Sequence, residues 1–225
     1  MSLLVAKDSG YGAYKGFAYT GSENGGKFYS YPAIISSAKN LPGGDSLATR
    51  DILDDLFVNY RGKDYWLGEK AFSNRTRTFN LDPNKLSTET EIIKLLGGLG
   101  YINHLTGKKE FKVVTGIPVQ QYNSFKNVVS NSWVGAFNFS FRGKNLTLKI
   151  EKVLPTAQGA GVYYDMALGW DKVLDNHFFE KRVLIFDFGT KTTNVVPMQK
   201  GQYISDMALT VWTGVSEIHV ILKIF

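Results

Sequence analysis

Apolar and polar positions alternate in short runs along the first third of the chain, which is the pattern of β-strands. Glycine, serine and asparagine lie between the runs, and these residues favour turns. The runs that predict strands here are residues 3–6, 15–19, 27–31, 56–60 and 64–67. Residues 36–48 are rich in Ser, Gly, Asn and Pro and predict a loop. Residues 33–80 are therefore expected to form a small subdomain inserted into the first sheet.

A helical repeat follows. Thr88 and Glu91 have the spacing of a capping box. The apolar residues that then recur at helical intervals are Ile92, Leu95, Leu96, Leu99 and Ile102. Gly97 and Gly98 fall inside this helix, where each glycine costs about 1 kcal/mol.

The second half of the chain alternates between the two kinds of element. Strands are predicted at residues 111–115, 136–141, 146–150, 183–186, 193–198 and 203–211. Helices are predicted at residues 119–129, along Val162, Met166, Trp170 and Val173, and after Gly214. This alternation predicts an α/β architecture with mixed sheets covered by helices.

The composition narrows the class of protein. With 44% hydrophobic residues among 225, the chain can form a sizeable core in one large or two smaller domains. It has no cysteine, which excludes disulfides and thiolate chemistry. No apolar run approaches the roughly 20 residues that span a bilayer, and the first residues lack the apolar core of a signal peptide. We therefore expect a cytoplasmic protein without direct membrane contact.

The net charge of +6 is spread thinly, and no nucleic-acid-binding motif accompanies it. Direct nucleic-acid binding is therefore not expected.

The most informative feature is a repeated hairpin signature. Residues 8–15 read Asp-Ser-Gly-Tyr-Gly-Ala-Tyr-Lys, and residues 187–194 read Asp-Phe-Gly-Thr-Lys-Thr-Thr-Asn. Each segment follows an apolar strand, turns at Asp-x-Gly and leads into a second strand. One Asp-x-Gly alone is an ordinary turn, but two with matched flanks are much less expected by accident.

Such hairpins suit a phosphate chain. Glycine lets backbone N–H groups approach phosphate closely, which applies to Gly10, Gly12 and Gly189. Further donors of hydrogen bonds or positive charge in the two segments are Lys15, Thr190, Thr192 and Thr193. Magnesium prefers oxygen ligands and keeps several waters, so Asp8 and Asp187 are expected to hold it through water.

These segments resemble the phosphate-1 and phosphate-2 loops of the actin superfamily. The likeness is greatest to the prokaryotic actin-like ATPases, namely the ParM-type plasmid-segregation actins and their archaeal relatives. Asn194 stands where those relatives commonly have Asp. Residues 154–161 also resemble the family, because Pro, Gln and Gly there precede the connecting helix. Residues 213–218 are similar to a glycine-led helix start, in which Glu217 would face the ribose.

The resemblance implies an actin-like, ribonuclease H-like α/β fold, with mixed sheets, helices on both faces and an incomplete second domain. Domain I would span residues 1–155, and residues 156–225 would form the connecting helix and the start of domain II. Gln158 would position the attacking water, and Asp187 would share the catalytic role. The nucleotide-binding residues would be Asp8, Gly10, Tyr11, Gly12, Lys15, Gly189, Thr190, Lys191, Thr192, Thr193, Gly214 and Glu217.

The implied function is ATP hydrolysis, with Mg²⁺, coupled to self-association into filaments. An adaptor protein would link the filament to plasmid or other DNA. The family's second outer subdomain and adenosine loop are not recognisable after Glu217, so we expect a fragment that binds nucleotide weakly. All of this requires the turns at residues 8–15 and 187–194 to face each other across a gap.

Two alternatives remain open. A small-molecule kinase of the same superfamily needs a catalytic base, for which Asp206 and Glu180 are candidates. A non-catalytic scaffold would keep the fold without turnover.

Overall fold

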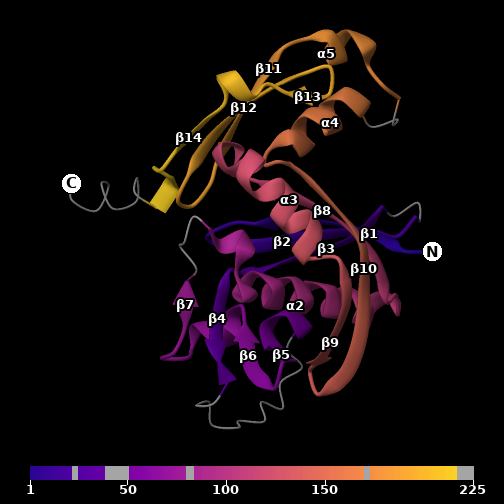
Figure 1. The fold of residues 1–225 in the computed structure, drawn as a ribbon, viewed down its shortest axis with the longest axis vertical. Helices are drawn as coiled ribbons and strands as arrows, with labels where there is room; N and C mark the ends of the chain where they lie inside the picture. Colours follow the sequence, from indigo (N-terminus) through magenta and orange to yellow (C-terminus); the bar gives the residue numbers. More distant parts are fainter. Residues whose placement is uncertain (22–24, 39–50, 80–83, 170–172, 217–225) are drawn as a thin grey trace. The chain divides into compact units, whose positions relative to one another are not determined.

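The computed structural model describes residues 1–21, 25–38, 51–79, 84–169 and 173–216. The chain divides into two compact units (Figure 1). Unit 1 contains Met1–Val114 and Val128–Leu154, and unit 2 contains Thr115–Asn127 and Pro155–Phe225. The boundaries fall within β8, α3 and β10, whose bounds are Glu110–Ile117, Tyr122–Ser132 and Lys144–Ala157.

The described part of the chain forms a sheet of ten strands through unit 1, in the order β3-β2-β1-β8-β10-β9-β5-β6-β4-β7. Its other strands are β1 (Leu3–Ser9), β2 (Ala13–Tyr19), β3 (Gly26–Pro32), β4 (Ile34–Ser37), β5 (Leu56–Tyr60), β6 (Lys63–Leu67), β7 (Thr78–Phe79) and β9 (Gly135–Phe141). The strands predicted from alternation in this part of the chain are confirmed. Of the predicted loop at 36–48, Ser36 and Ser37 belong to β4, and residues 39–50 lie outside the described residues.

Strand β1 shows how the alternation works. Its buried residues are Leu3, Val5, Lys7 and Ser9, which occupy every second position and therefore share one face. Asp8 belongs to the opposite face. Because β1 and β2 pair antiparallel, Asp8 lies directly opposite Lys15. The strand thus separates its core-facing residues from the residues of the predicted phosphate site.

Helix α2 (Glu89–Thr106) packs closely on this sheet, and its predicted apolar stripe is largely confirmed. This close packing explains why two glycines occur in the middle of the helix. A Cβ on Gly97 would overlap the Leu67 side chain, and a Cβ on Gly98 would overlap the Tyr29 hydroxyl. The Tyr29 ring also blocks any side chain on Gly16 of β2, so the ring tip lies clamped between helix and sheet. The helix tolerates its glycines because they allow this close approach.

The predicted capping box at the start of α2 is wrong. The Thr88 hydroxyl donates to the carbonyl of Lys85 at 2.6 Å. The Glu91 side chain does not return to the helix start, because it is fully buried beside two lysines. Its spacing from Thr88 reflects a tertiary contact instead of a local cap.

Unit 2 contains a second sheet of β11 (Val183–Phe188), β12 (Thr193–Gln199), β13 (Gln202–Tyr203) and β14 (Leu209–Val211). Helices α4 (Ala160–Leu168) and α5 (Asn176–Glu180) accompany it. The strand predicted over residues 203–211 is interrupted, because Ser205–Met207 forms a 3-10 helix. The remaining short helices in the described residues are α1 (Glu69–Phe72) and 3-10 turns at Ile52–Asp55, Lys85–Ser87 and Val119–Gln121.

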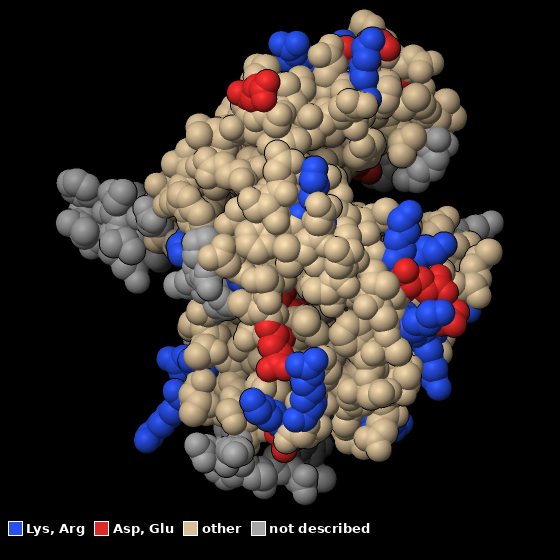
Figure 2. All heavy atoms as spheres, viewed as in Figure 1, with Lys and Arg blue, Asp and Glu red and all other residues tan. Residues whose placement is uncertain are grey.

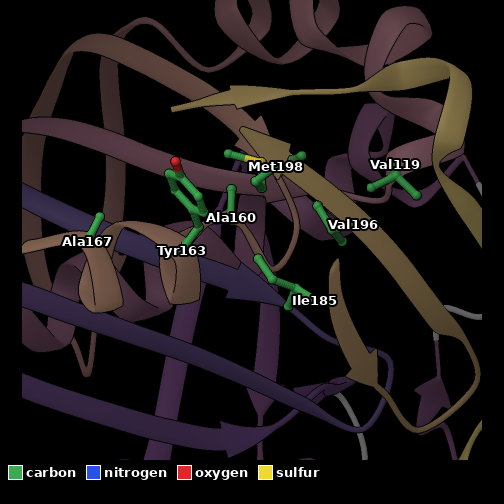
Figure 3. Packing of buried hydrophobic residues seen from close by; sticks show 8 residues of the cluster. Val119, Ala160, Tyr163, Ala167, Ile185, Val196 and Met198 are labelled. Carbon is green, nitrogen blue, oxygen red and sulfur yellow. The ribbon is translucent and has the colours of Figure 1, made fainter. Parts of the chain in front are cut away.

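The core of unit 2 lies between α4 and one face of the sheet (Figure 3). Its residues are Val119, Ala157, Ala160, Tyr163, Ala167, Ile185, Val196 and Met198. The Tyr163 hydroxyl donates to the carbonyl of Phe179 at 2.8 Å, which ties α4 to α5. The helix predicted from this spacing is confirmed at Val162 and Met166, but α4 ends at Leu168, before Val173. These three apolar side chains are exposed, so they do not form the buried side of the helix. Trp170 lies outside the described residues.

The opposite face of this sheet carries exposed apolar side chains. Strand register places Phe186 and Leu209 on either side of Val195, and Phe188 and Val211 on either side of Thr193. The exposed members, which we call the apolar face, are Leu184, Phe186, Phe188, Leu209 and Val211. They are 42% to 67% exposed. An apolar sheet face of this kind is unusual at a protein surface.

Charged side chains on the face drawn in Figure 2 are interspersed, with acidic groups among the basic ones. This agrees with a thinly spread positive charge. Within the described residues, no helix combines the length and the hydropathy needed to cross a membrane.

Candidate nucleotide-binding site

The first Asp-x-Gly hairpin belongs to unit 1. Strand β1 ends at Ser9, the turn follows, and β2 starts at Ala13. A Cβ on Gly10 would lie 2.6 Å from the carbonyl oxygen of Ala13, so this turn excludes a side chain at that position. The cross-strand pair of Asp8 and Lys15 places a carboxylate beside an exposed ammonium group. These are the charges that a magnesium–phosphate complex requires.

Beneath this hairpin lies a buried charge cluster, formed by Lys7, Ser9, Lys85, Glu91 and Lys94. The Lys7 ammonium lies 2.9 Å from Glu91 Oε1 and 2.8 Å from Ser9 Oγ, and the Ser9 hydroxyl donates to Glu91. The Lys94 ammonium lies 2.8 Å from Glu91 Oε2. The cluster thus connects β1 to the first turns of α2.

Lys85 is the member of the cluster that contacts the turn of the first hairpin. Its ammonium donates to the carbonyl of Ser9 and lies 3.7 Å from the centroid of the Tyr11 ring. The side chain is 3% exposed. A charge-assisted hydrogen bond and a cation–π contact therefore hold two successive parts of the turn.

The protonation of the cluster follows from its charges. Burial alone would raise the pKa of Glu91, but the nearby Lys7, Lys94 and Lys85 lower it to about 2. Burial lowers the pKa of Lys7 to about 8, and Glu91 only partly offsets this effect. Burial likewise lowers the pKa of Lys85 to about 8. One glutamate shared among several lysines cannot compensate all of them.

The second Asp-x-Gly hairpin belongs to unit 2. The Gly189 N–H donates to the carbonyl of Thr192 at 2.8 Å and closes the turn. Register places Asp187 opposite Asn194, whose amide lies 3.4 Å from Asp187 Oδ2. The Asn194 carbonyl oxygen accepts from the hydroxyl of Thr210 at 2.8 Å. Asn194 therefore presents a donor to Asp187, where an aspartate would present a second negative charge.

The segment around Gly214 lies directly against this second turn. The N–H groups of Val215 and Ser216 donate to the carbonyls of Gly189 and Thr190, at 3.0 and 3.1 Å. A Cβ on Gly214 would overlap the Thr190 backbone.

Two further contacts connect the same parts of unit 2. The Thr193 hydroxyl donates to the carbonyl of Thr213 at 2.9 Å. The Lys191 ammonium lies 5.5 Å from the centroid of a Trp212 ring. Glu217, the predicted ribose contact, lies outside the described residues.

Gln158 precedes α4, which begins after Gly159 at a positive φ of 92°. The Gln158 N–H donates to the carbonyl of Ile117 at the end of β8, at 2.8 Å. A Cβ on Gly116 would lie 3.3 to 3.5 Å from three Gln158 carbons. The end of β8 therefore holds the backbone of Gln158 directly ahead of α4.

The candidate bases of the kinase alternative have surface partners. Glu180 forms an exposed ion pair with Lys200 at 2.8 Å. Asp206, also exposed, accepts a hydrogen bond from the Ser205 hydroxyl at 3.0 Å. Neither contact resembles the enclosed setting of a catalytic base.

Each hairpin, taken by itself, has side chains and backbone groups of the kind that a magnesium–phosphate ligand requires. A Cβ would lie 2.6 Å from the Ala13 carbonyl oxygen at Gly10 and 3.0 Å from the Thr192 carbonyl oxygen at Gly189, so both turns are tight. Register places each aspartate opposite a cross-strand donor, Lys15 or Asn194. The described residues contain no group of three or more acidic or histidine side chains that would hold a bare metal ion.

A surface hollow of about 420 Å³ lies elsewhere in unit 1. Its lining residues, none of which was predicted for the site, are Asp55, Phe57, Trp66, His104, Phe141, Arg142 and Lys144.

Sequence reasoning missed the buried charge cluster. Lys7 carries the only usable signal, because it follows Leu3 and Val5 in the period of two that marks the buried face of β1. Lys85 and Glu91 lie about 80 residues away in sequence and give no local sign of the contact.

The sequence of the chain was compared with models of protein families and with curated proteins. Residues 6–161 match the family described as actin like proteins N terminal domain. No curated protein sequence matches the chain.

Three solved structures illustrate the likeness of fold. The AlfA filament from the B. subtilis plasmid pLS32 is 21% identical with a TM-score of 0.72, and the match covers 100% of this chain and 78% of that one. The apo pSK41 ParM protein is 16% identical with a TM-score of 0.75, covering 97% and 68%. An AlfA filament bound to AMPPNP is 21% identical with a TM-score of 0.68, covering 99% and 76%. The predicted actin-like α/β fold is thus confirmed, and the chain belongs to the family of actin-like proteins.

Proposed function

We propose that this protein binds MgATP through its two Asp-x-Gly hairpins and assembles into filaments with copies of itself. The observation that carries the proposal is the matched construction of the hairpins, each with a glycine turn and a cross-strand aspartate, in a chain of the actin-like family. An AlfA filament of similar fold is bound to AMPPNP, which supports a nucleotide ligand.

The proposed roles follow from the chemistry of each residue. Lys15 and Lys191 would neutralise phosphate charge, and the backbone at Gly10, Tyr11, Gly12 and Gly189 would donate to phosphate oxygens. Further contacts would come from Thr190, Thr192, Thr193, Gly214 and Glu217. Asp8 and Asp187 would orient the waters of Mg²⁺, which neutralises developing charge during phosphoryl transfer. Gln158 would position the attacking water.

We further propose that nucleotide state controls assembly. The similar AlfA structures are filaments, which supports self-association of this chain. Residues 1–155 would act as domain I, with a subdomain at about 33–80, and residues 156–225 would begin domain II. The filament would act in the cytoplasm to move plasmid or other DNA through an adaptor protein.

Nucleotide binding is tested by calorimetry with MgATP and MgAMPPNP on the 225-residue chain. We expect weak but saturable binding that Asp187→Ala removes and that Asp206→Ala, an exposed change in the same unit, leaves intact. Equal binding by the wild type and Asp187→Ala would refute the assignment of the second hairpin. An absence of saturable binding by the wild type would refute the nucleotide proposal as a whole.

Assembly is tested by light scattering and electron microscopy with ATP, ADP and AMPPNP. We expect filaments with ATP or AMPPNP and fewer with ADP. Gln158→Ala should slow phosphate release while filaments still form, because Gln158 is assigned to hydrolysis and not to binding. Filaments that form equally without nucleotide would contradict nucleotide control.

A further inference from the structure

The buried charge cluster carries more positive than negative charge. Among the described residues, the ammonium groups of Lys7, Lys85 and Lys94 face one carboxylate within the cluster, that of Glu91. Asp8, on the other face of β1, adds a second carboxylate to their electrostatic surroundings. One positive charge is therefore left over in a site from which water is largely excluded. A buried surplus charge is costly unless an opposite charge comes near.

Lys85 places part of this surplus positive charge next to the turn of the first Asp-x-Gly hairpin. Its ammonium donates to the Ser9 carbonyl, and that peptide group also carries the N–H of Gly10. In a trans peptide the two groups point in opposite directions, so this N–H points away from Lys85. A cation on the carbonyl polarises the peptide and strengthens its N–H as a donor. The positive charge thus acts on the turn from its buried side.

The second contact of Lys85 fixes the next part of the turn. The ammonium lies 3.7 Å from the centroid of the Tyr11 ring, which follows Gly10 directly. Lys85 itself belongs to the 3-10 turn Lys85–Ser87 ahead of α2, so it lies outside both strands of the hairpin. One side chain therefore anchors the turn and brings charge to it from a different element.

We propose that Lys85 is a positioning residue for the phosphate of the bound nucleotide, acting through the Ser9–Gly10 peptide with the buried charge cluster as its support. The inference rests on the proposed nucleotide function. Lys15, on the outer face of the hairpin, would meet the ligand directly, whereas Lys85 acts from beneath. The incoming phosphate compensates the charge that the cluster leaves over.

The test is calorimetry of the full chain with MgAMPPNP, accompanied by thermal unfolding of each variant. Lys85→Met removes the charge and nearly keeps the side-chain length, and Lys85→Arg keeps the charge. Lys109→Met is the matched control, because it removes an exposed lysine beyond the far end of α2, about 27 Å along an 18-residue helix. We expect Lys85→Met to weaken binding by at least about tenfold, as for loss of a charge-assisted hydrogen bond. Lys85→Arg should stay within about threefold of the wild type, and Lys109→Met should match it.

Several results would overturn the proposal. Wild-type affinity in Lys85→Met would do so, and an equal loss in Lys85→Arg would show that packing matters rather than charge. If Lys85→Met does not fold, the Lys85→Gln variant is measured instead, because it keeps a hydrogen-bond donor without the charge. Wild-type affinity for MgAMPPNP in Lys85→Gln would refute the role of Lys85. If the wild type itself binds no MgAMPPNP, the proposed function and this inference fall together. A wild type that binds alongside unaffected Lys85 variants removes this inference alone.

Discussion

The Gly98→Ala substitution separates helix propensity from packing. Alanine in place of glycine favours an isolated helix by about 1 kcal/mol. In α2, however, the new Cβ would overlap the Tyr29 hydroxyl and lie 2.9 Å from two ring carbons. Comfortable carbon–carbon contacts start at roughly 3.5 Å, so the ring would have to move by at least about 0.6 Å. Tyr29 is 1% exposed and is held by Gly16 from the sheet side, so this movement is obstructed.

Overpacking of this kind costs about 1 to 3 kcal/mol, and the large overlap here places Gly98→Ala at the upper end. After the gain in propensity, we expect a net loss of about 1 to 2 kcal/mol. The assay is urea unfolding followed by circular dichroism and tyrosine fluorescence. The matched control is Gly161→Ala in α4, where a Cβ meets nothing within 4 Å and the gain in propensity should remain.

A compensating change sharpens the test. The Tyr29 hydroxyl is buried and has no hydrogen-bond partner among the residues that the structure describes, so Tyr29→Phe alone should cost little. It removes the worst overlap, and the double variant with Gly98→Ala should recover part of the loss through a coupling of about 1 kcal/mol. If Gly98→Ala is as stable as Gly161→Ala, or if the two changes at Gly98 and Tyr29 add without coupling, the clamp does not exist as described.

Three further predictions concern charge and surface. The free energy of unfolding should fall as pH drops from 4.5 toward 2, because the lowered pKa of Glu91 contributes about 3 kcal/mol that is lost on protonation. Acid titration followed by fluorescence measures this loss. The Glu91→Gln variant should be less stable at pH 7 and should not show the loss between pH 4.5 and 2. Asn194→Asp places a like charge opposite Asp187 and should cost about 1 kcal/mol without magnesium; urea midpoints with and without Mg²⁺ test this, and an unchanged midpoint would contradict it. Phe186→Ser on the apolar face should change stability by less than about 0.5 kcal/mol and reduce binding of a hydrophobic dye, whereas Ile185→Ser on the buried face should unfold unit 2.

Most elements could be predicted from the sequence because they depend on local patterns. The alternation in β1 and the repeat of Leu95, Leu96 and Leu99 in α2 both correspond to buried faces. The failures come from tertiary contacts. Glu91 imitates a capping residue but pairs with Lys7, 84 residues away in sequence. Such a contact has no local signature.

The candidate site divides in the same way. The Asp-x-Gly turns could be found from sequence because glycine and aspartate have specific backbone roles. The contacts that hold these turns in place could not be found from sequence. The docking of Gly214 on Thr190 and the contact of Lys85 with Ser9 depend on how separate elements meet. In α4 a stripe from Val162 to Met166 has helical spacing, yet the smaller Ala160 and Ala167 face the core beside Tyr163. Apolar spacing alone does not decide which side a short helix buries.

The alternation of β1 limits which changes in chain length the protein can accept. Lys7 and Ser9 belong to the buried face, and Asp8 between them belongs to the other. Deleting a single residue upstream within the strand would exchange the two sets, burying a carboxylate where an amine belongs and turning Lys7 outward. Natural variation in this segment should therefore consist of substitutions, with gains or losses of residues confined to the far loops of the sheet.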